Sequence, residues 1–370
     1  MNIHLLLNHP SMAYPTVNYY DTFFPRDHVF WIIRSTKVNW NDECLVKHTR
    51  VKKIVSSNLL SEWKYSYQIV KELSKIDGLI FLHNLTVFSF RMMVLALFLF
   101  PSVVSRCVWL SWGSDLYGLT NQIQVKKNIP IKIYRNICFR FVNNLKMVVT
   151  CFPADQNLVR EKFKKVRKVI SFPYVGLPTN QINEEEKLDF VKSNKSTIKV
   201  LCGHRTTEAV CNLEGLKLLS KYCNENINIY IPACGSGDEG YYNSVKKCAE
   251  EIFGDKVIYI PSYLTLSQLN ALSKEMDVIL MPTYRRQVAL GTIKLFLKHH
   301  KKVFLSEKSE MFNFFGNLNV EIYKCEDIKD MSFDEFSLPV KDFSGADRYV
   351  ESTSDKTKLA AEWAEILKKL

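Results

Sequence analysis

The sequence lacks the spacings of a structural metal site. Its ten cysteines are scattered, no two of them form a C-x-x-C pair, and no combination of histidine and cysteine has the spacing of a zinc site. Cys107, Cys151 and Cys202 stand in apolar runs, where cysteine behaves as a small hydrophobic residue. This usage predicts a reducing, cytosolic compartment, and it argues against a disulfide scaffold.

Long hydrophobic runs are also missing. The longest, Met92 to Phe100, is about half of the ~20 residues that a membrane-spanning helix needs. The opening residues MNIHLLLNHPSM have no charged stretch and are too short for a signal peptide, so they are interpreted as a first strand. We therefore expect a chain that does not span a membrane, although it can lie against one.

The excess of positive over negative charge lies entirely in the first half of the chain. Residues 1–183 contain 24 Lys and Arg against 10 Asp and Glu, whereas the remainder contains 26 against 28. The overall net charge of +12 is therefore a property of the N-terminal half. This asymmetry predicts an anionic partner for that half, which is a membrane surface, a nucleic acid or a phosphorylated substrate.

Apolar runs and helical patterns alternate along the chain, which predicts an α/β protein with parallel, doubly wound sheets. With 370 residues, two domains are expected. The polar stretch Thr179 to Ser196 is interpreted as the linker. In the first half the expected strands are Ile3–Leu7, Val29–Ile33, Lys53–Val55, Gly78–Leu82, Cys107–Leu110, Met147–Cys151 and Val169–Phe172, and the expected helices are Leu60–Ile76, Val87–Phe100, Ile129–Val142 and Asp155–Lys164.

The second half repeats this alternation. Its expected strands are Ile198–Leu201, Ile227–Ile231, Val257–Ile260, Val278–Met281, Val303–Leu305 and Val320–Tyr323, and its expected helices are Glu208–Tyr222, Gly240–Ile252, Leu266–Lys274 and a C-terminal helix Ser354–Leu370. We therefore divide the chain into residues 1–180, residues 195–350 and a final helix, residues 351–370, that packs back on the first domain.

The stretch from Val278 to Leu305 is the most informative in the chain. A buried strand is followed by a polar turn that contains Arg285, Arg286 and Gln287, then by Gly291 and Thr292 at the start of an amphipathic helix. Ligands of such crossovers bind where strand ends meet helix N-termini, and those termini attract phosphate. The pattern predicts a diphosphate site, and the alternative is an ordinary crossover with solvated arginines.

Three more turns of small residues follow expected strands of the second half. One contains Gly203 and Arg205, the next Cys234 and Gly235, and the third Tyr263, which is placed to cover a nucleobase. The turn at Gly203 lacks the dinucleotide and P-loop patterns. Because the carboxyl ends of parallel strands share one edge, these turns are expected to outline one crevice with the arginine turn.

Two side chains of the first half are candidates for chemistry. Asp115 ends a strand within Trp112-Gly113-Ser114-Asp115-Leu116-Tyr117, where it is interpreted as a general base, a ligand of a sugar hydroxyl, or a helix N-cap. His83 ends the preceding strand and is expected to face the same cleft, or else to be a packed core histidine. No Ser-His-Asp arrangement can be identified from the spacing.

The expected helix from Ile129 to Val142 interleaves cations with apolar residues. Lys132, Arg135 and Arg140 alternate there with isoleucine, tyrosine and phenylalanine, which is typical of a surface that meets anionic lipid. The very apolar helix Val87–Phe100 either adds to that face or is buried in the core. No signature of a nucleic-acid-binding module is present, so we expect no nucleic acid partner.

These residues resemble the bacterial Fuc4NAc transferases, which transfer 4-acetamido-4,6-dideoxygalactose from its dTDP derivative in enterobacterial common antigen synthesis. The resemblance runs from about residue 78 to 315. The family's W-G-x-D-L-Y stretch matches Trp112 to Tyr117, and its R-Q-x-x-x-G-T stretch matches Arg286 to Thr292. The resemblance implies a GT-B fold, in which two Rossmann-like domains flank a central cleft, the C-terminal domain holds the nucleotide-sugar and the N-terminal domain holds the acceptor.

The resemblance further implies a peripheral enzyme on the cytoplasmic face of the bacterial inner membrane. It would move a deoxy-aminosugar from a dTDP-sugar, with UDP or GDP as the alternatives, to a polyprenyl-diphosphate-linked glycan of O-antigen, capsule or common antigen. Since no D-x-D pair is present, we expect no metal and no cofactor. Two other hypotheses remain, which are a sugar-nucleotide epimerase-like enzyme and a glycan-binding protein without activity.

Overall fold

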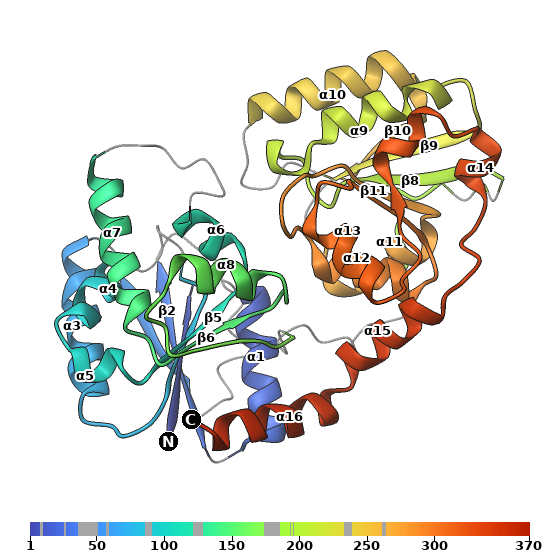
Figure 1. Cartoon of the computed structure of the whole chain (residues 1–370). Coiled ribbons are helices and arrows are strands. Elements are labelled where there is room, and N and C mark those ends of the chain that lie inside the picture. Colours follow the sequence, from blue (N-terminus) through green and yellow to red (C-terminus); the bar gives the residue numbers. More distant parts are fainter. Residues whose placement is uncertain are drawn as a thin grey trace. The chain divides into compact units, whose positions relative to one another are not determined.

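The computed structural model describes residues 1–7, 10–25, 27–35, 51–56, 59–85, 91–120, 129–173, 186–192, 194, 196–232, 239–260 and 264–370. The chain forms two compact units (Figure 1). Unit 1 comprises Met1–Pro178 together with Lys356–Leu370, and unit 2 comprises Thr179–Asp355. Unit 2 is therefore one continuous segment, whereas unit 1 is assembled from two segments on either side of it.

Unit 1 is built on a parallel sheet of seven strands, sheet A, in the order β3-β2-β1-β4-β5-β6-β7. The order reverses between β1 and β4, which makes that pair the switch point of the sheet. The strands are β1 (Asn2–Leu7), β2 (His28–Ser35), β3 (Val51–Ser56), β4 (Ile80–His83), β5 (Cys107–Ser111), β6 (Met147–Thr150) and β7 (Lys168–Ser171).

Helices cover both faces of sheet A. The helices are α1 (Pro10–Phe23), α3 (Leu59–Leu73), α4 (Arg91–Phe98), α5 (Pro101–Val104), α6 (Ser114–Leu119), α7 (Ile129–Asn143), α8 (Asp155–Lys162) and α16 (Lys356–Lys368). One face packs on α3, α4, α5, α7 and α8, and the other packs on α1 and α16. Trp363 of α16 contacts the rings of Phe81 and Phe172 on that second face. The last helix of the chain thus completes the core of unit 1.

Unit 2 is built on a six-stranded parallel sheet, sheet B, in the order β10-β9-β8-β11-β12-β13. Its switch point lies between β8 and β11. The strands are β8 (Ile198–Cys202), β9 (Ile227–Pro232), β10 (Val257–Ile260), β11 (Val278–Met281), β12 (Lys302–Leu305) and β13 (Tyr323–Lys324), and the helices are α9 (Asn212–Leu219), α10 (Glu239–Phe253), α11 (Leu266–Glu275), α12 (Leu290–Lys298), α13 (Glu310–Asn317), α14 (Phe333–Ser337) and α15 (Ser344–Ser354).

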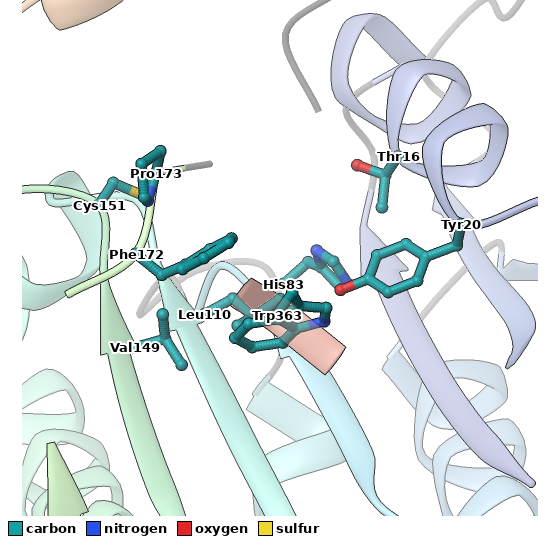
Figure 2. Close-up of a pocket in the computed structure, with 9 residues that line it drawn as sticks. All are labelled: Thr16, Tyr20, His83, Leu110, Val149, Cys151, Phe172, Pro173 and Trp363. Atoms are coloured by element: carbon teal, nitrogen blue, oxygen red, sulfur yellow. The ribbon is translucent and has the colours of Figure 1, made fainter. Parts of the chain in front are cut away.

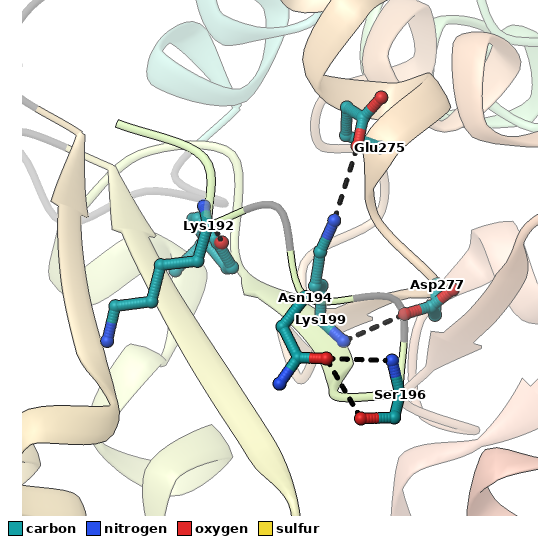
Figure 3. A network of polar contacts seen from close by, with 7 residues as sticks. Lys192, Asn194, Ser196, Lys199, Glu275 and Asp277 are labelled. Carbon is teal, nitrogen blue, oxygen red and sulfur yellow. Dashed lines mark hydrogen bonds and ion pairs between the residues drawn. The ribbon is translucent and has the colours of Figure 1, made fainter. Parts of the chain in front are cut away.

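Polar contacts fix the amino ends of β8 and β11 (Figure 3). The Oδ2 of Asp277, just before β11, accepts a hydrogen bond of 2.8 Å from the backbone N–H of Lys199 in β8. The buried Lys199 ammonium pairs with Glu275 at 3.2 Å. Asn194 bonds the backbone and the hydroxyl of Ser196 in the segment that enters β8. β8 and β11 flank the switch point. These contacts therefore hold together the amino ends of the two central strands of sheet B.

The strands agree with the sequence-based expectation except the last, which was expected at Val320–Tyr323 and is the two-residue β13, Tyr323–Lys324. Several helices also differ from the expectation. The segment Glu208–Tyr222 was expected as one helix, but α9 occupies only its middle and is flanked by 3₁₀ turns, Glu208–Val210 and Ser220–Tyr222. Helix α1 was not expected, and it contains Pro15. In the C-terminal segment α15 ends at Ser354 and α16 begins at Lys356, so the chain bends there.

The apolar helix α4 is part of the core. Met93, Val94, Ala96 and Leu97 are buried among the residues of the α3, α4 and α7 face. Of the alternatives for this segment, the structure shows the core helix for residues 93–97, which are buried or half-buried, whereas Phe98 and Leu99 are 44% and 58% exposed. Within the described residues, no helix has both the length and the apolar character needed to cross a bilayer.

Candidate functional site

The turn after β8 is shaped around a glycine. Gly203 has a φ of +81°, and a Cβ there would meet the side chains of Asn212 and Val210 at 2.6 Å. Asn212 holds the turn from inside, because its Nδ2 donates to the carbonyl of Cys202 at 2.8 Å and its Oδ1 accepts from the N–H of Thr207. Gly203 is itself buried, so the missing Cβ leaves the space in which Asn212 and Val210 pack against the backbone of this turn.

Two polar atoms of this turn have no partner in the protein. The Nδ1 of His204 and the Oγ1 of Thr207 are buried and make no hydrogen bond. Burial, together with the Arg205 guanidinium, lowers the pKa of His204 to about 3, so the imidazole is neutral at physiological pH. Buried polar groups are nearly always paired. A ligand with hydroxyl or phosphoryl oxygens is therefore a natural complement to these atoms.

The turn after β11 lies at the neighbouring strand end. The Thr283 hydroxyl donates to the carbonyl of Ala209 at 2.7 Å, which ties this turn to the turn after β8. It also accepts the N–H of Arg285 at 3.2 Å. On the other side of β8, the Thr206 hydroxyl donates to the carbonyl of Pro232 at the end of β9 at 2.6 Å. Hydrogen bonds thus connect the carboxyl ends of three adjacent strands into one edge.

Arg286 is paired within the protein. Its Nη1 lies 3.1 Å from Oε1 of Glu310, the first residue of α13, and the two side chains are 24% and 42% exposed. Sequence reasoning missed Glu310, because it lies 24 residues after Arg286 and in no motif. Ser309 adds a second tie, because its hydroxyl donates to the carbonyl of Arg285 at 2.8 Å. Both predicted arginines are therefore held at this edge and half-buried.

Two helices start at this edge without a cap from the side chain of the residue before them, and in the first turn of α9 the N–H of Leu213 donates to the Tyr241 hydroxyl at 3.3 Å. The residue before α9 is Cys211 (φ 60°), and the residue before α12 is Ala289 (φ 53°). Neither makes a side-chain cap hydrogen bond. Gly291 and Thr292 lie in the first turn of α12. Free N–H groups and the helix dipole make such termini favourable for an anion.

The predicted donor residues divide into two groups. The structure brings together at the carboxyl edge of sheet B those from the turns after β8 and β11 and from the start of α12, which are Gly203, Arg205, Arg285, Arg286, Gln287, Gly291 and Thr292. Cys234, Gly235 and Tyr263 lie outside the described residues. No group of three or more His, Cys, Asp or Glu that could hold a metal occurs in the described ranges.

Unit 1 contains a pocket near the carboxyl ends of its strands (Figure 2). Its enclosed part is small, with a volume of about 20 Å³, and it opens to solvent. The lining residues are Thr16, Tyr20, His83, Leu110, Val149, Cys151, Phe172, Pro173 and Trp363. Trp363 is buried, and its indole Nε1 has no hydrogen-bond partner in the protein. The pocket therefore combines an apolar wall with polar groups from α1, β4 and α16.

His83 lies in the wall of this pocket and is buried. Its Nε2 is 2.8 Å from Nδ1 of His4. Burial, together with the nearby His28, lowers the pKa of His83 to about 3. The next residue, Asn84, has a left-handed backbone (φ 65°), and its Oδ1 is buried without a partner. His83 ends β4 as expected and is buried, as in the alternative of a packed core histidine, and a catalytic role stays a prediction.

Asp115 has the contacts of a residue that fixes loops. Its Oδ2 accepts from the N–H of Leu85 and from Nε1 of Trp109, each at 2.8 Å. Its Oδ1 accepts from the Ser111 hydroxyl and from the N–H groups of Trp112 and Leu116, each at 3.0 Å. Burial raises the pKa of Asp115, and these hydrogen bonds oppose that effect. A base role stays a prediction, and of the expected alternatives the N-cap is not observed, because Gly113 occupies that position.

The basic residues of α7 differ in exposure. Lys132 and Arg140 are exposed, and Ile133 between them is 57% exposed. Arg135 is only half-exposed, and its Nη2 donates to the carbonyl of Leu119 at 2.8 Å, at the end of α6. Lys132 and Arg140 are thus available to a partner, whereas Arg135 has a structural contact in unit 1.

Solved structures of similar fold cover the whole chain. The HepE protein of Anabaena, in complex with UDP and glucose, has a TM-score of 0.66 and 11% identity, with 100% of each chain covered. An α,α-trehalose-phosphate synthase (UDP-forming) from Burkholderia vietnamiensis has a TM-score of 0.65 and 8% identity, again over 100% of each chain. The trehalose-6-phosphate enzyme of E. coli, bound to UDP-2-fluoroglucose, has a TM-score of 0.64 and 10% identity over 100% and 99% of the chains. The fold is that of the GT-B glycosyltransferases.

The sequence matches none of the curated protein sequences with which it was compared. It does match a family model over residues 68–331. This span contains the turns after β8 and β11 in unit 2 and the strands β4 to β7 in unit 1. The family match and the two parallel sheets support the same enzyme class, a glycosyltransferase. The chain belongs to the 4-alpha-L-fucosyltransferase family, glycosyl transferase group 56.

Proposed function

We propose that this glycosyltransferase moves a deoxy-aminosugar such as Fuc4NAc from a dTDP-sugar to a polyprenyl-diphosphate-linked glycan. The product would serve O-antigen, capsule or common antigen synthesis at the cytoplasmic face of the bacterial inner membrane. The observation that carries the donor side is the edge of sheet B at β8 and β11, where two uncapped helix N-termini and two half-buried arginines lie together.

The arginine turn would hold the diphosphate. Negative charge builds on the leaving diphosphate as its bond to the sugar breaks, and donors already fixed in place stabilise that charge. Arg286 is now paired with Glu310 at 3.1 Å. A diphosphate that binds Arg286 would compete with this carboxylate, so the pair would keep the guanidinium in place until the donor arrives. Gly291 and Thr292 would present the N-terminal amides of α12 to the same group.

The same edge supports metal-independent transfer. Arginine and a helix terminus supply the positive charge that a divalent cation supplies in other glycosyltransferases. We expect turnover to persist after exhaustive chelation with EDTA. Loss of turnover on chelation, restored by Mg²⁺ or Mn²⁺, would contradict this part of the proposal.

The acceptor would bind unit 1. The pocket there offers apolar and aromatic walls with polar groups at their edges, which is the composition that sugar rings favour (Figure 2). Two of those groups, His83 and the Trp363 indole N–H, are in place for hydroxyl contacts. Asp115 would be a positioning group in unit 1, because its carboxylate accepts hydrogen bonds from the backbone of Leu85 and of Trp112 and so fixes the loops that contain them. Of the three functional hypotheses, glycosyl transfer is the one that the family and the fold support.

Nucleotide preference tests the donor assignment. Thermal unfolding of the full chain is measured with dTDP, UDP and GDP, and dTDP is expected to give the largest stabilisation. Arg286→Ala should remove most of that shift, while Arg348→Ala, at an exposed position of α15, should keep it. A preference for UDP or GDP would overturn the dTDP assignment alone. An unchanged shift in Arg286→Ala would overturn the site.

Vesicle binding tests the membrane assignment. The full chain should sediment with vesicles that contain phosphatidylglycerol, and far less with pure phosphatidylcholine, since each surface cation near anionic lipid contributes ~1 kcal/mol. The double variant Lys132→Glu, Arg140→Glu should lose binding. The matched variant Lys274→Glu, Lys341→Glu changes two exposed lysines of unit 2, so equal loss in both variants would contradict the α7 surface.

A further inference from the structure

The enclosed part of the unit 1 pocket is a small apolar recess on sheet A. Leu110 of β5 and Val149 of β6 both line it, and they are Cα partners in the strand register. Their side chains therefore lie next to each other on one face of the sheet. Each is the last residue but one of its strand. The recess thus lies beside the carboxyl ends of β5 and β6, on the face that packs on α1 and α16.

Two aromatic rings stand beside this pair of aliphatic side chains (Figure 2). Phe172 follows β7, Trp363 belongs to α16, and their ring centroids are 5.0 Å apart. Both residues are buried, whereas Cys151 and Pro173, which also line the pocket, are half-buried. The recess is therefore walled by two aliphatic and two aromatic side chains that the fold holds in place.

The lining side chains whose usual pKa values lie closest to neutrality are uncharged here. Burial, together with the nearby His28, lowers the pKa of His83 to about 3. Burial, together with Asp115 and Asp155, raises the pKa of the Cys151 thiol. The wall surface that faces the pocket is almost wholly apolar. A charged or strongly hydrated group would therefore lose its water on entry and gain few hydrogen bonds in return.

The size of the recess admits one small group. Its volume of about 20 Å³ is somewhat more than the roughly 10–15 Å³ that a single water molecule requires, and far less than the roughly 300 Å³ at which pockets for whole ligands begin. A water molecule needs about two to four polar partners, and an almost wholly apolar wall offers few. A methyl group needs none, and its transfer from water into apolar surroundings is favourable.

We propose that the recess is a subsite for the methyl group of one substituent on the acceptor sugar, while the sugar ring itself stays outside it. Sugars carry such a methyl in two places, on an acetamido group and on a 6-deoxy carbon, and the recess fits the chemistry that both share. The inference rests on the proposed function, because it assigns the ligand to the acceptor that unit 1 would hold.

The subsite would make the methyl a determinant of acceptor choice. In a hydrophobic pocket the presence or absence of one methyl changes kcat/KM by about 10- to 200-fold. A hydroxyl in the same place would be buried against apolar surface without a partner, which is unfavourable. Val149 and Trp363 would therefore act as specificity residues that contact the substituent, and they take no part in bond making.

Xenon tests the recess without any sugar, because it is an apolar atom that enters small dry cavities. The full chain carries ¹³C-labelled leucine and valine methyls, and xenon should shift the NMR signals of Leu110 and Val149. Val148, the neighbour of Val149, packs in the core on the other face of sheet A, so its signals should stay in place. Unshifted signals of Leu110 and Val149 would show that the recess admits no apolar group and would overturn the subsite.

Pairs of sugars that differ by one methyl identify its source. N-acetylglucosamine is compared with N-formylglucosamine, and L-fucose is compared with L-galactose, which has a 6-hydroxyl. We expect the methyl-bearing member of at least one pair to shift the Leu110 and Val149 signals and to bind at least about tenfold more tightly than its partner. The pair that responds tells an acetamido methyl from a 6-deoxy methyl. If no sugar shifts these signals, or the members of both pairs bind equally, the subsite is wrong.

Val149→Leu fills the recess from the sheet. The added methylene should reduce the preference for the methyl-bearing sugar at least about tenfold. The matched variant Val148→Leu makes the same change on the other face of sheet A and should keep the preference. Val149→Ala enlarges the recess, so it should favour a sugar in which an ethyl group replaces that methyl, and it decides if Val149→Leu does not fold. Wild-type preference in the Val149 variants would overturn the subsite.

Nucleotide binding separates this inference from the proposed function. The donor edge lies in unit 2, so dTDP should raise the unfolding temperature of Val149→Leu as much as that of the wild type. A full chain that binds no nucleotide, but whose Leu110 and Val149 signals respond to the methyl-bearing sugar, would overturn the proposed function and leave the recess as a sugar subsite. A chain that binds dTDP without this response to sugar would overturn the subsite alone.

Discussion

At the scale of single residues, Asp115 has a structural role that its motif did not reveal, and its expected role as a base stays a prediction. Its motif position at a strand end suggested a base. The structure surrounds its carboxylate with five donors, two of them on Oδ2 and three on Oδ1. Gly113 in the same motif has a φ of +93°, and Tyr117 donates to Asp155 at 2.7 Å. The motif therefore builds the corner between β5 and α6.

Asp115→Asn is expected to destabilise unit 1. The new amide nitrogen would face N–H donors, which leaves at least two buried donors unpaired at about 1–3 kcal/mol each. Urea unfolding followed by tryptophan emission measures this loss, because all six tryptophans belong to the segments of unit 1. Asp77→Asn, at an exposed position, should be neutral. Unchanged stability together with abolished turnover would instead support a base.

The buried histidines make unit 1 sensitive to acid. Their pKa values are depressed in the folded state, so the unfolded chain binds more protons below pH 6.5 and stability falls as pH decreases toward about 3. Lowering the pH from 6.5 to 5.5 should cost about 1 kcal/mol for each such histidine. In His4→Phe the decrease over this interval should be smaller by that amount. An identical pH dependence in both proteins would show that His4 titrates normally.

The positions of the expected donor residues could be predicted where a residue suited to phosphate directly follows an expected strand or starts an expected helix. Gly203, Arg285, Arg286 and Gly291 follow apolar strands directly or start a helix, so parallel-sheet geometry alone places them together. Glu310 was not predictable, because nothing local marks it as the partner of Arg286. The unit 1 pocket was not predictable either, since its wall joins Thr16 to Trp363, which are nearly the whole chain apart, and only tertiary packing brings them together.

At the scale of elements, unit 2 uses buried lysines to terminate helices. The Lys302 ammonium, at the start of β12, donates to the carbonyls of Glu335, Phe336 and Leu338 at 2.7, 3.1 and 3.2 Å. These are among the carbonyls that α14 leaves unpaired at its C-terminus. Lys302 is 4% exposed. One side chain therefore joins the amino end of β12 to a five-residue helix.

Lys302→Met should lower the stability of unit 2 by about 2–4 kcal/mol, because several buried carbonyls lose their donor. Far-UV circular dichroism follows the loss, and the tryptophan emission of unit 1 serves as the internal reference. Lys341→Met removes an exposed lysine of the same unit and is expected to stay within about 0.5 kcal/mol of wild type. Equal effects of the two substitutions would show that the lysine caps are unimportant.

The elements that the sequence predicted share a physical property. Strands buried on both faces consist of short apolar runs, and sheet B repeats that pattern in β8, β9 and β11. Helix α1 escaped prediction because it carries Pro15 and many tyrosines, and its stability comes from packing on sheet A. Helices α13 and α14 are eight and five residues long, too short for a periodic pattern to establish them.

At the scale of the whole molecule, each unit has its own candidate ligand site at the switch-point edge of its own sheet. In unit 2 this edge joins the turns after β8 and β11, and in unit 1 it lies beside β4 and β5. Parallel sheets of this kind bind ligands there because the chain departs in opposite directions from the two central strands. A shared topology thus gives each unit a candidate ligand site by the same principle.

Hydrogen exchange should locate the nucleotide in one unit. With dTDP at about a hundred times its dissociation constant, local stabilisation of ~2.7 kcal/mol is expected. Peptides that contain Gly203–Asn212 and Arg285–Thr292 should exchange more slowly, and peptides from the unit 1 pocket should not. Arg286→Ala under the same conditions should show no protection. Protection confined to the peptides of unit 1 would reverse the assignment of donor and acceptor sites.

Helix α16 links the order in which the chain is synthesised to the completion of the unit 1 pocket. Trp363 lines the unit 1 pocket, yet it is translated only after every residue of unit 2. A nascent chain that has completed the strands of sheet A therefore still lacks one wall of this pocket. If the pocket binds the acceptor as proposed, it becomes complete only once the whole of unit 2 has been synthesised.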